Sequence, residues 1–201
     1  MTLTPKDVAA FVANAHAAIH EEEQHLNAAD ANVGDGDTGS MLRRVVDAMA
    51  KIDTAGAASL ADAAMGLAQA AMKETGSSLG TLVATAAMTL AKAAKSADGD
   101  IGAGDMGRVV AEMRDAVAAR GKAAPGDKTV IDSLDAIAAA LDEGPANRAT
   151  AARAAADALD AFRDKPCRIG RARMFPERST GADDPGMLAI ARVLNHATVT
   201  Q

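Results

Sequence analysis

The segment Asp30-Ala-Asn-Val-Gly-Asp-Gly-Asp-Thr-Gly39 concentrates the residues best suited to chemistry in this chain. The carboxylates of Asp30, Asp35 and Asp37 fall within eight residues, and a Gly in each gap lets the backbone fold so that their oxygens converge. Carboxylates this close repel one another, whereas Mg²⁺ is held by a few carboxylates together with substrate phosphates. Asp-Gly pairs are also typical of polar turns, and the spacing alone does not decide between a metal site and a turn.

Two glycine-containing segments offer weaker signals for anion binding. Gly76-Ser77-Ser78 would supply N–H groups and hydroxyls at a helix start, which suits an anion and an ordinary helix cap alike. The segment 121–129 resembles a phosphate-binding loop, but Asp127 separates its second Gly from Lys128, and a helix rather than a strand precedes it. We therefore expect a loop between helices with Lys128 in solvent.

The run from Gly170 to Gly186 mixes arginines, glycines and acids in what we expect to be a long connection without regular structure. Arg171 and Arg178 could bind phosphate oxygens in a bidentate manner or form surface ion pairs, and Asp184 could be only a helix cap. These residues by themselves do not decide between the alternatives.

The histidines indicate a solvated helix face rather than a metal site. His16 and His20 are four residues apart, but no His-Glu-x-x-His pattern surrounds them, and the acidic run 21–23 follows directly. Neither a Ser/His/Asp nor a Cys/His arrangement emerges, so covalent catalysis by this chain is a weak hypothesis. The solitary Cys167 cannot form an internal disulfide.

Helices must position these residues, because alanine dominates the sequence and runs of β-branched or aromatic residues are missing. Thr4-Pro5-Lys6-Asp7, Ser59 with Asp62, and Asp184-Pro185 are typical helix starts. The predicted fold is all-α, a single bundle of about eight helices. The expected ranges are about 5–27, 40–49, 60–73, 76–97, 105–121, 129–143, 145–162 and 185–195.

Length and composition limit the function classes. The 201 residues suffice for one domain, and the net charge of −6 with 1% aromatic residues argues against nucleic-acid binding. The charged N-terminus does not fit a signal peptide, and the longest apolar run, 81–91, is about half of a membrane span. We expect a soluble, cytoplasmic protein of one domain, 1–201, with no membrane or nucleic-acid partner.

Four segments together resemble the nucleotide-binding L subunit (DhaL-type) of bacterial dihydroxyacetone kinase. They are Gly34-Asp-Gly-Asp-Thr-Gly39, Gly76-Ser-Ser78, the run from Arg120 to Thr129 and the run from Gly170 to Gly186, in the order of the family. The match spans nearly the whole chain. Several motifs in order are far more specific than any one, so the resemblance favours the metal interpretation of the first segment.

The resemblance implies an eight-helix antiparallel barrel whose loops at one end hold ADP or ATP through two Mg²⁺ ions. Asp30, Asp35 and Asp37 would be the metal ligands, and Arg171 and Arg178 would act in catalysis. The residues implied to surround the nucleotide are Thr38, Gly39, Ser40, Met41, Ser77, Ser78, Gly121, Val130, Arg171, Asp184, Pro185 and Gly186.

In the family, a separate K subunit holds a ketose covalently on its own histidine and receives the phosphoryl group from the L subunit. In one branch an M subunit of the phosphotransferase system recharges the bound ADP, whereas in ATP-dependent relatives the nucleotide exchanges. The branch, the ketose and a homodimeric state are left open by the sequence. Thr38 and Ala182 replace histidines often found in the family, so other short ketoses or tetroses stay open as acceptors.

The alternatives to a phosphotransferase are a non-catalytic nucleotide-binding module, which would sense the nucleotide and relay it to a partner, and a metal-dependent phosphatase. The missing nucleophile agrees with phosphoryl transfer, which needs positioning and charge neutralisation rather than a covalent residue.

Overall fold

The computed structural model describes residues 2–74, 78–170 and 172–196. Its elements in chain order are α1 (Pro5–Ala31), α2 (Thr38–Met49), α3 (Leu60–Lys73), α4 (Ser78–Ser96), η1 (Ala103–Asp105), α5 (Met106–Gly121), α6 (Val130–Glu143), α7 (Arg148–Arg163), η2 (Ala172–Met174), α8 (Pro176–Ser179) and α9 (Pro185–Asn195). The two η elements are single turns of 3₁₀-helix. The all-α prediction is confirmed, and the described residues contain no strand beyond one isolated bridge between Thr2 and Gly102.

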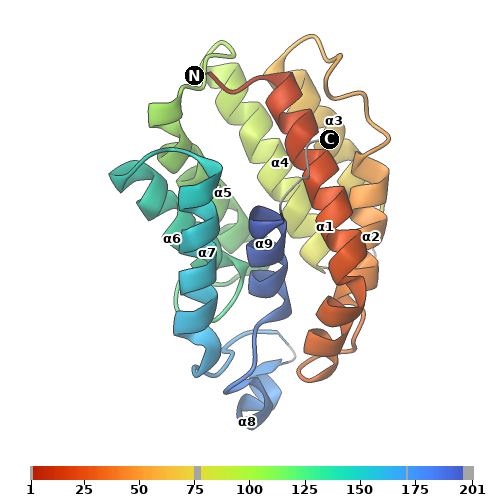
Figure 1. The fold of residues 1–201 in the computed structure, drawn as a ribbon, viewed down its shortest axis with the longest axis vertical. Helices are drawn as coiled ribbons and strands as arrows, with labels where there is room; N and C mark the ends of the chain where they lie inside the picture. Colours follow the sequence, from red (N-terminus) through yellow and green to blue (C-terminus); the bar gives the residue numbers. More distant parts are fainter. Residues whose placement is uncertain (1, 75–77, 171, 197–201) are drawn as a thin grey trace.

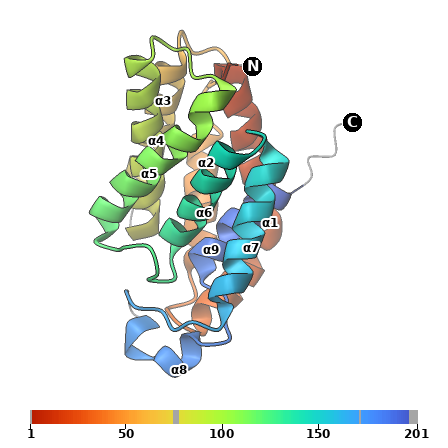
Figure 2. The ribbon, with the colours of Figure 1, turned by 90° about the vertical axis from the view of Figure 1, so that its left-hand side faces the viewer.

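The long helices of the described residues, α1 to α7 and α9, run up and down and close into a ring (Figures 1 and 2). Each helix from α1 to α6 packs against the next one, α7 packs against α9, and α9 packs against α1. Short α8 lies below this ring at one end of the molecule (Figure 1). Alternation of direction therefore brings the N-termini of α2, α4, α6 and α9 to the end where α8 lies.

Local capping explains most helix starts. Thr4 and Asp7 form a capping box at α1, Thr129 and Asp132 form another at α6, and Ser59 caps α3. The α3 range matches its expected bounds. In two segments the helices differ from those expected from the sequence. Helix α1 continues to Ala31, since the alanines after Asn27 favour helix, and the run 170–186 is not structureless, because η2 and α8 occupy much of it.

The core is built from small side chains at close helix contacts. One cluster gathers residues of α1, α2, α6, α7 and α9, and a second cluster joins α1, α3, α4 and α5. Leu26, Met41 and Met187 are almost completely buried, while many contacts are made by alanine, which lets helices approach closely. Among the described helices, none is both long and apolar enough to cross a membrane.

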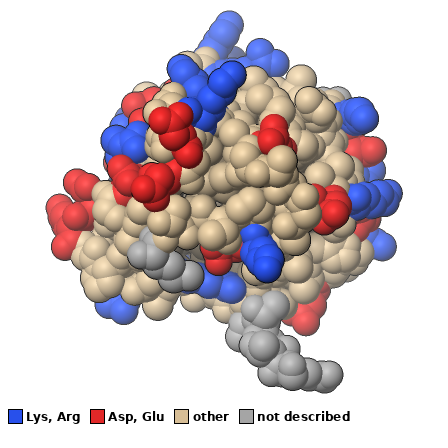
Figure 3. Space-filling view, turned by 90° about the horizontal axis from the view of Figure 1, so that it is seen from above, with Lys and Arg blue, Asp and Glu red and all other residues tan. Residues whose placement is uncertain are grey.

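Charged residues of both signs are interspersed at the end of the molecule opposite α8, around uncharged surface (Figure 3). The residues singled out by their chemistry lie instead toward the other end.

Candidate functional site

Three carboxylates meet where α1 passes into α2. Oxygens of Asp30, Asp35 and Asp37 all lie within 4.8 Å of one another, with Asp30 buried in the last turn of α1 and the other two exposed. Asp30 is held rigidly, because its Oδ2 accepts the backbone N–H groups of Asp37 at 3.0 Å and Thr38 at 3.2 Å. An all-oxygen group of this kind fits a hard cation such as Mg²⁺.

Close packing of α1 against α2 sets the position of this group. A Cβ atom on Gly39 would overlap the Glu23 carbonyl oxygen, and one on Gly34 would overlap the Asp30 carboxylate. Both positions therefore need glycine for close approach rather than for a turn alone. At these two positions the backbone passes so close to α1 that a Cβ atom does not fit.

Polar residues of α1 that sequence analysis missed fasten the first turn of α2. Asn27 donates from Nδ2 to Ser40 Oγ at 2.9 Å and accepts the Ser40 N–H at 3.1 Å. Glu23 accepts from Ser40 Oγ at 2.9 Å and from Arg43 Nη1 at 2.7 Å, and Arg43 holds the pKa of Glu23 below its ordinary value. The spacing 23, 27, 30 marks one helix face and was the available signal.

The contacts between Glu23, Asn27 and Ser40 tie side chains of α1 to the first turn of α2. The acidic run 21–23 is not wholly a solvated face, because the Glu23 side chain is only 15% exposed. The hydroxyl of Ser40 is engaged with α1, and the Met41 side chain is buried at 2% exposure. Thr38 and Gly39 complete the first turn beside the carboxylates, at the positive end of the α2 dipole.

A second group of predicted residues meets where α4, α6 and α9 begin. A Cβ on Gly186 would lie 2.6 Å from Val130 Cγ1 and 3.9 Å from Leu79 Cδ1, so the first turns of these three helices pack tightly. Pro185 opens α9 and is buried. Gly121 ends α5, close to Leu82 of α4.

Asp184 caps α9 by accepting the Met187 N–H at 2.8 Å. Burial of its carboxyl group among protein atoms raises the pKa of Asp184 to about 6, against the lowering effects of the two N–H groups it accepts and of Lys128. The carboxyl group is thus poised to change protonation slightly below neutral pH.

Lys128 is buried at 1% exposure, which corrects the expectation that it lies in solvent. Its Nζ donates to the carbonyl oxygens of Arg163 at 2.7 Å, Lys165 at 2.8 Å and Ser179 at 2.6 Å. Arg163 and Ser179 end α7 and α8, where carbonyl oxygens at the negative end of a helix dipole attract a cation. These two oxygens also accept the backbone N–H groups of Gly181 and Ala182. One ammonium group thereby joins the loop before α6 to the ends of two helices.

Of the remaining predicted site residues, the structure describes only some. Arg178, on α8, is exposed and its guanidinium lies 4.7 Å from the centre of the Phe175 ring. Ser78 begins α4, but its side chain is outside the described part. Ser77 and Arg171 lie outside the described residues.

Comparison with known proteins decides the family. A family model, the DAK2 domain, matches residues 32–198. This chain belongs to the DAK2 domain family. This chain is 38% identical over 190 residues to a D-erythrulose kinase of Mycolicibacterium smegmatis, and the match covers 87% of this chain and 32% of that relative. The domain therefore spans about a third of the length of that curated relative.

Two further relatives bear on the nucleotide. The DAK2 domain is 29% identical to a PEP-dependent dihydroxyacetone kinase ADP-binding subunit of Listeria innocua, over 89% of this chain and 87% of that one. It also superposes on the dihydroxyacetone kinase of C. freundii, crystallised with AMP-PNP and Mg²⁺, with a TM-score of 0.72 and 26% identity over 96% of this chain and 34% of that chain. The similar proteins are thus kinases or kinase subunits.

Proposed function

We propose that this DAK2 domain is the nucleotide-binding, L-type component of a ketose kinase. It binds ADP or ATP through Mg²⁺ and transfers a phosphoryl group to a short ketose that a K-type subunit holds covalently. The observation that carries the proposal is the convergence of Asp30, Asp35 and Asp37 at the end where four helices begin. Relatives named as ADP-binding subunits and as erythrulose kinases support it.

In the proposed site, the carboxylates bind the metal ions and the helix N-termini bind the phosphates. Asp30, Asp35 and Asp37 would hold two Mg²⁺ ions, and bound Mg²⁺ neutralises phosphate charge that the carboxylates alone would repel. Helix N-termini favour anions, so the starts of α2, α4, α6 and α9 suit a polyphosphate near the carboxylates. Thr38, Gly39 and Ser78 belong to these first turns, as do the Val130, Pro185 and Gly186 positions.

The direct test is calorimetric titration of ADP and ATP into the tag-free chain, with Mg²⁺ and with a chelator. Asp35→Asn and Asp37→Asn keep the size of the side chain and remove its charge, and both residues are exposed, so the fold should survive. We expect each change to weaken Mg-nucleotide binding at least about tenfold. Asp157→Asn, an exposed carboxylate on α7, is the matched control and should bind like the original chain.

Nucleotide binding that is indifferent to chelation, or that survives both loop substitutions, would contradict the proposal. Native mass spectrometry with Mn²⁺ in place of Mg²⁺ counts the ions, and we expect two per nucleotide.

Transfer is tested by adding a K-type subunit loaded with dihydroxyacetone or erythrulose and following the phosphorylated sugar by ³¹P NMR. Arg178 and Arg171 would stabilise the negative charge of the phosphoryl group in the transition state of the transfer. Arg178→Ala should therefore lower kcat about a hundredfold or more, with little effect on nucleotide affinity. Phosphate release from ATP without a partner would instead indicate a phosphatase, and nucleotide binding without transfer would indicate a regulatory module.

The donor is tested in the same mixture. Recharging of tightly bound ADP by a phosphorylated M-type subunit, which gives up its phosphoryl group, and exchange of free ATP give different dependences on added ATP. In the first case product forms without any free ATP, and in the second it stops when ATP is withheld.

A further inference from the structure

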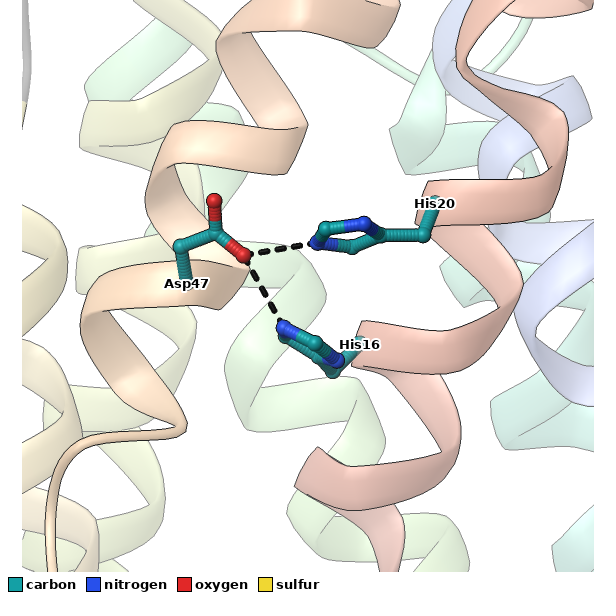
Figure 4. Close-up of side chains that lie close together, drawn as sticks. All are labelled: His16, His20 and Asp47. Atoms are coloured by element: carbon teal, nitrogen blue, oxygen red, sulfur yellow. Dashed lines mark hydrogen bonds and ion pairs between the residues drawn. The ribbon is translucent and has the colours of Figure 1, made fainter.

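A second cluster of metal-binding side chains lies between α1 and α2, outside the carboxylate group described above. His16 and His20 on α1 both direct Nε2 toward Oδ1 of Asp47 on α2 (Figure 4), at 2.9 Å and 2.7 Å. The three ligand atoms lie within 4.8 Å of one another. Sequence analysis placed these histidines on a solvated face because nothing local points to Asp47.

Helix geometry preorganises the cluster. Residues four apart share a helix face, and the two imidazole rings lie with their centroids 4.3 Å apart. Asp47 reaches them from the neighbouring helix, which packs along α1. Each of the three side chains is about one third exposed, at 38%, 34% and 36%, so water has access to the atoms they share.

The nearest cationic side chain, Arg43, does not contact Asp47 Oδ1, the oxygen that His16 and His20 share. Arg43 lies 4.0 Å from the other oxygen of Asp47, Oδ2, while its closer contact is with Glu23 at 2.7 Å. Hydrogen bonding from His20 and, more weakly, from His16 lowers the pKa of Asp47, so this carboxylate is ionised at neutral pH. Metal ions bind the neutral form of imidazole, so two histidines and one carboxylate supply a ligand set of net charge −1.

We propose that His16, His20 and Asp47 form a transition-metal site that binds Zn²⁺, with water as the fourth ligand. Tetrahedral Zn²⁺ with bonds near 2.1 Å separates its ligand atoms by about 3.4 Å. The present separations from Asp47 Oδ1, 2.9 Å for His16 and 2.7 Å for His20, are shorter by about 0.5 and 0.7 Å. Small rotations of the side chains would therefore make room for the ion. Imidazole nitrogen suits Zn²⁺ and not Mg²⁺, which prefers oxygen.

The proposed ion joins two helices, and the Ala17-Ala18-Ile19 spacer lacks the glutamate that serves as general base in a His-Glu-x-x-His site. Ten residues of helix, or about 15 Å, separate His20 from Asp30, so the two metal sites are distinct. The same pair of helices carries both sites. A Zn²⁺ brace between α1 and α2 would therefore stabilise the hairpin that presents the carboxylate loop.

The test uses the tag-free full chain with Mg²⁺ in large excess, so that the carboxylate loop does not take up the added ion. Co²⁺, whose visible absorption reports tetrahedral coordination, and Zn²⁺ in calorimetry are titrated in turn. We expect one equivalent to bind, and His16→Ala, His20→Ala and Asp47→Asn each to weaken binding about a hundredfold or more. His25→Ala, an exposed histidine of α1 bonded to Glu22, and Asp35→Asn are the controls and should bind normally.

A melting experiment separates loss of a ligand from damage to the fold. Zn²⁺ should raise the Tm of the original chain and of His25→Ala by several degrees, and leave the Tm of His20→Ala unchanged. Absence of stoichiometric binding, binding that survives the three cluster substitutions, or binding lost in Asp35→Asn overturns the proposal. None of these outcomes depends on whether the domain binds a nucleotide.

Discussion

Among single residues, Lys128 connects distant segments through one buried side chain, because its Nζ bonds Arg163, Lys165 and Ser179. Its ammonium group is surrounded by protein and donates three hydrogen bonds to carbonyl oxygens, two of them at helix ends and one at Lys165, just beyond α7. Desolvation lowers the pKa of Lys128, an effect opposed by the nearby acids Asp184 and Asp183. The position also has a φ of 62°, which a side chain other than glycine rarely adopts, so the bonds of the ammonium group offset backbone strain.

We predict that Lys128→Met lowers the free energy of unfolding by about 3 kcal/mol, because the three hydrogen bonds of the ammonium group are lost and an apolar side chain takes its place. In a domain of this size this corresponds to a fall in Tm of about 6–12 °C. Lys92→Met, an exposed lysine on α4, is the control and should melt within about 1 °C of the original chain. Equal melting of the two variants would show that the buried ammonium contributes no net stability.

Asp184 gives a prediction for pH dependence. Its folded-state pKa of about 6 lies above the ordinary value of 3.8, so between these values the folded chain binds more protons than the unfolded chain. The contribution of Asp184 to stability is therefore greatest below pH 4 and declines as the pH rises through 6, by about 2 kcal/mol.

Asp184→Asn keeps a good helix cap but cannot ionise. We expect the variant and the original chain to have similar stability at pH 4, and the variant to be more stable by about 2 kcal/mol at pH 7. Chemical unfolding at a series of pH values measures the difference. A difference that stays constant from pH 4 to pH 7 would contradict the raised pKa.

At the scale of the element, the α1–α2 hairpin is the unit that builds the carboxylate site. Glu23, Asn27 and Asp30, on one face of α1, each bind a group at the start of α2. The hairpin is thus fastened by polar contacts at the site end and by apolar contacts of Leu26 and Met41 in the core. Separation of the two helices should affect stability and ligand binding together.

We predict that Gly39→Ala disrupts this hairpin, because the added methyl group would overlap backbone of α1. The expected cost is about 2 kcal/mol of stability, a fall in Tm of about 4–8 °C, together with weaker Mg-nucleotide binding. Gly104→Ala, where nothing lies within 4 Å of the added atom, is the matched control and should have little effect. Unchanged melting and unchanged affinity in Gly39→Ala would show that α2 can shift without consequence.

At the scale of the whole molecule, the up-and-down ring gathers four helix N-termini at one end (Figure 1). Partial positive charge from their dipoles coincides there with three carboxylates, in a chain whose net charge is −6. This combination suits a ligand that carries both metal cations and phosphate anions. Metal cations alone would be repelled by the positive helix ends, and phosphate alone would be repelled by the three carboxylates.

We predict that Mg²⁺ and ADP stabilise the fold only together. At a ligand concentration about a hundred times the dissociation constant, the pair should add about 2.7 kcal/mol and raise Tm by about 5–11 °C, and a chelator should reverse the shift. ADP alone should have little effect because it meets Asp30, Asp35 and Asp37 without neutralisation. A full shift with ADP in the presence of chelator would contradict this picture. Asp37→Asn, measured in parallel, should show a smaller shift.

The sequence by itself determined the helices, since their starts depend on local capping and their length on alanine. Thr4 with Asp7 and Ser59 with Asp62 were sufficient to place the starts of α1 and α3. The carboxylate cluster was also predictable, because eight residues with two glycines bring Asp30, Asp35 and Asp37 together without help from distant segments. Its role as a nucleotide site stays a prediction.

Only the tertiary structure decided what distant residues do to one another. The pairing of Asp47 with His16 and His20 needs two helices side by side, and the burial of Lys128 needs the ends of α7 and α8, 35 and 51 residues further along the chain. Neither partner is marked in the local pattern. Local sequence fixes backbone preference, but the free energy of a charged side chain depends on the groups that packing brings around it.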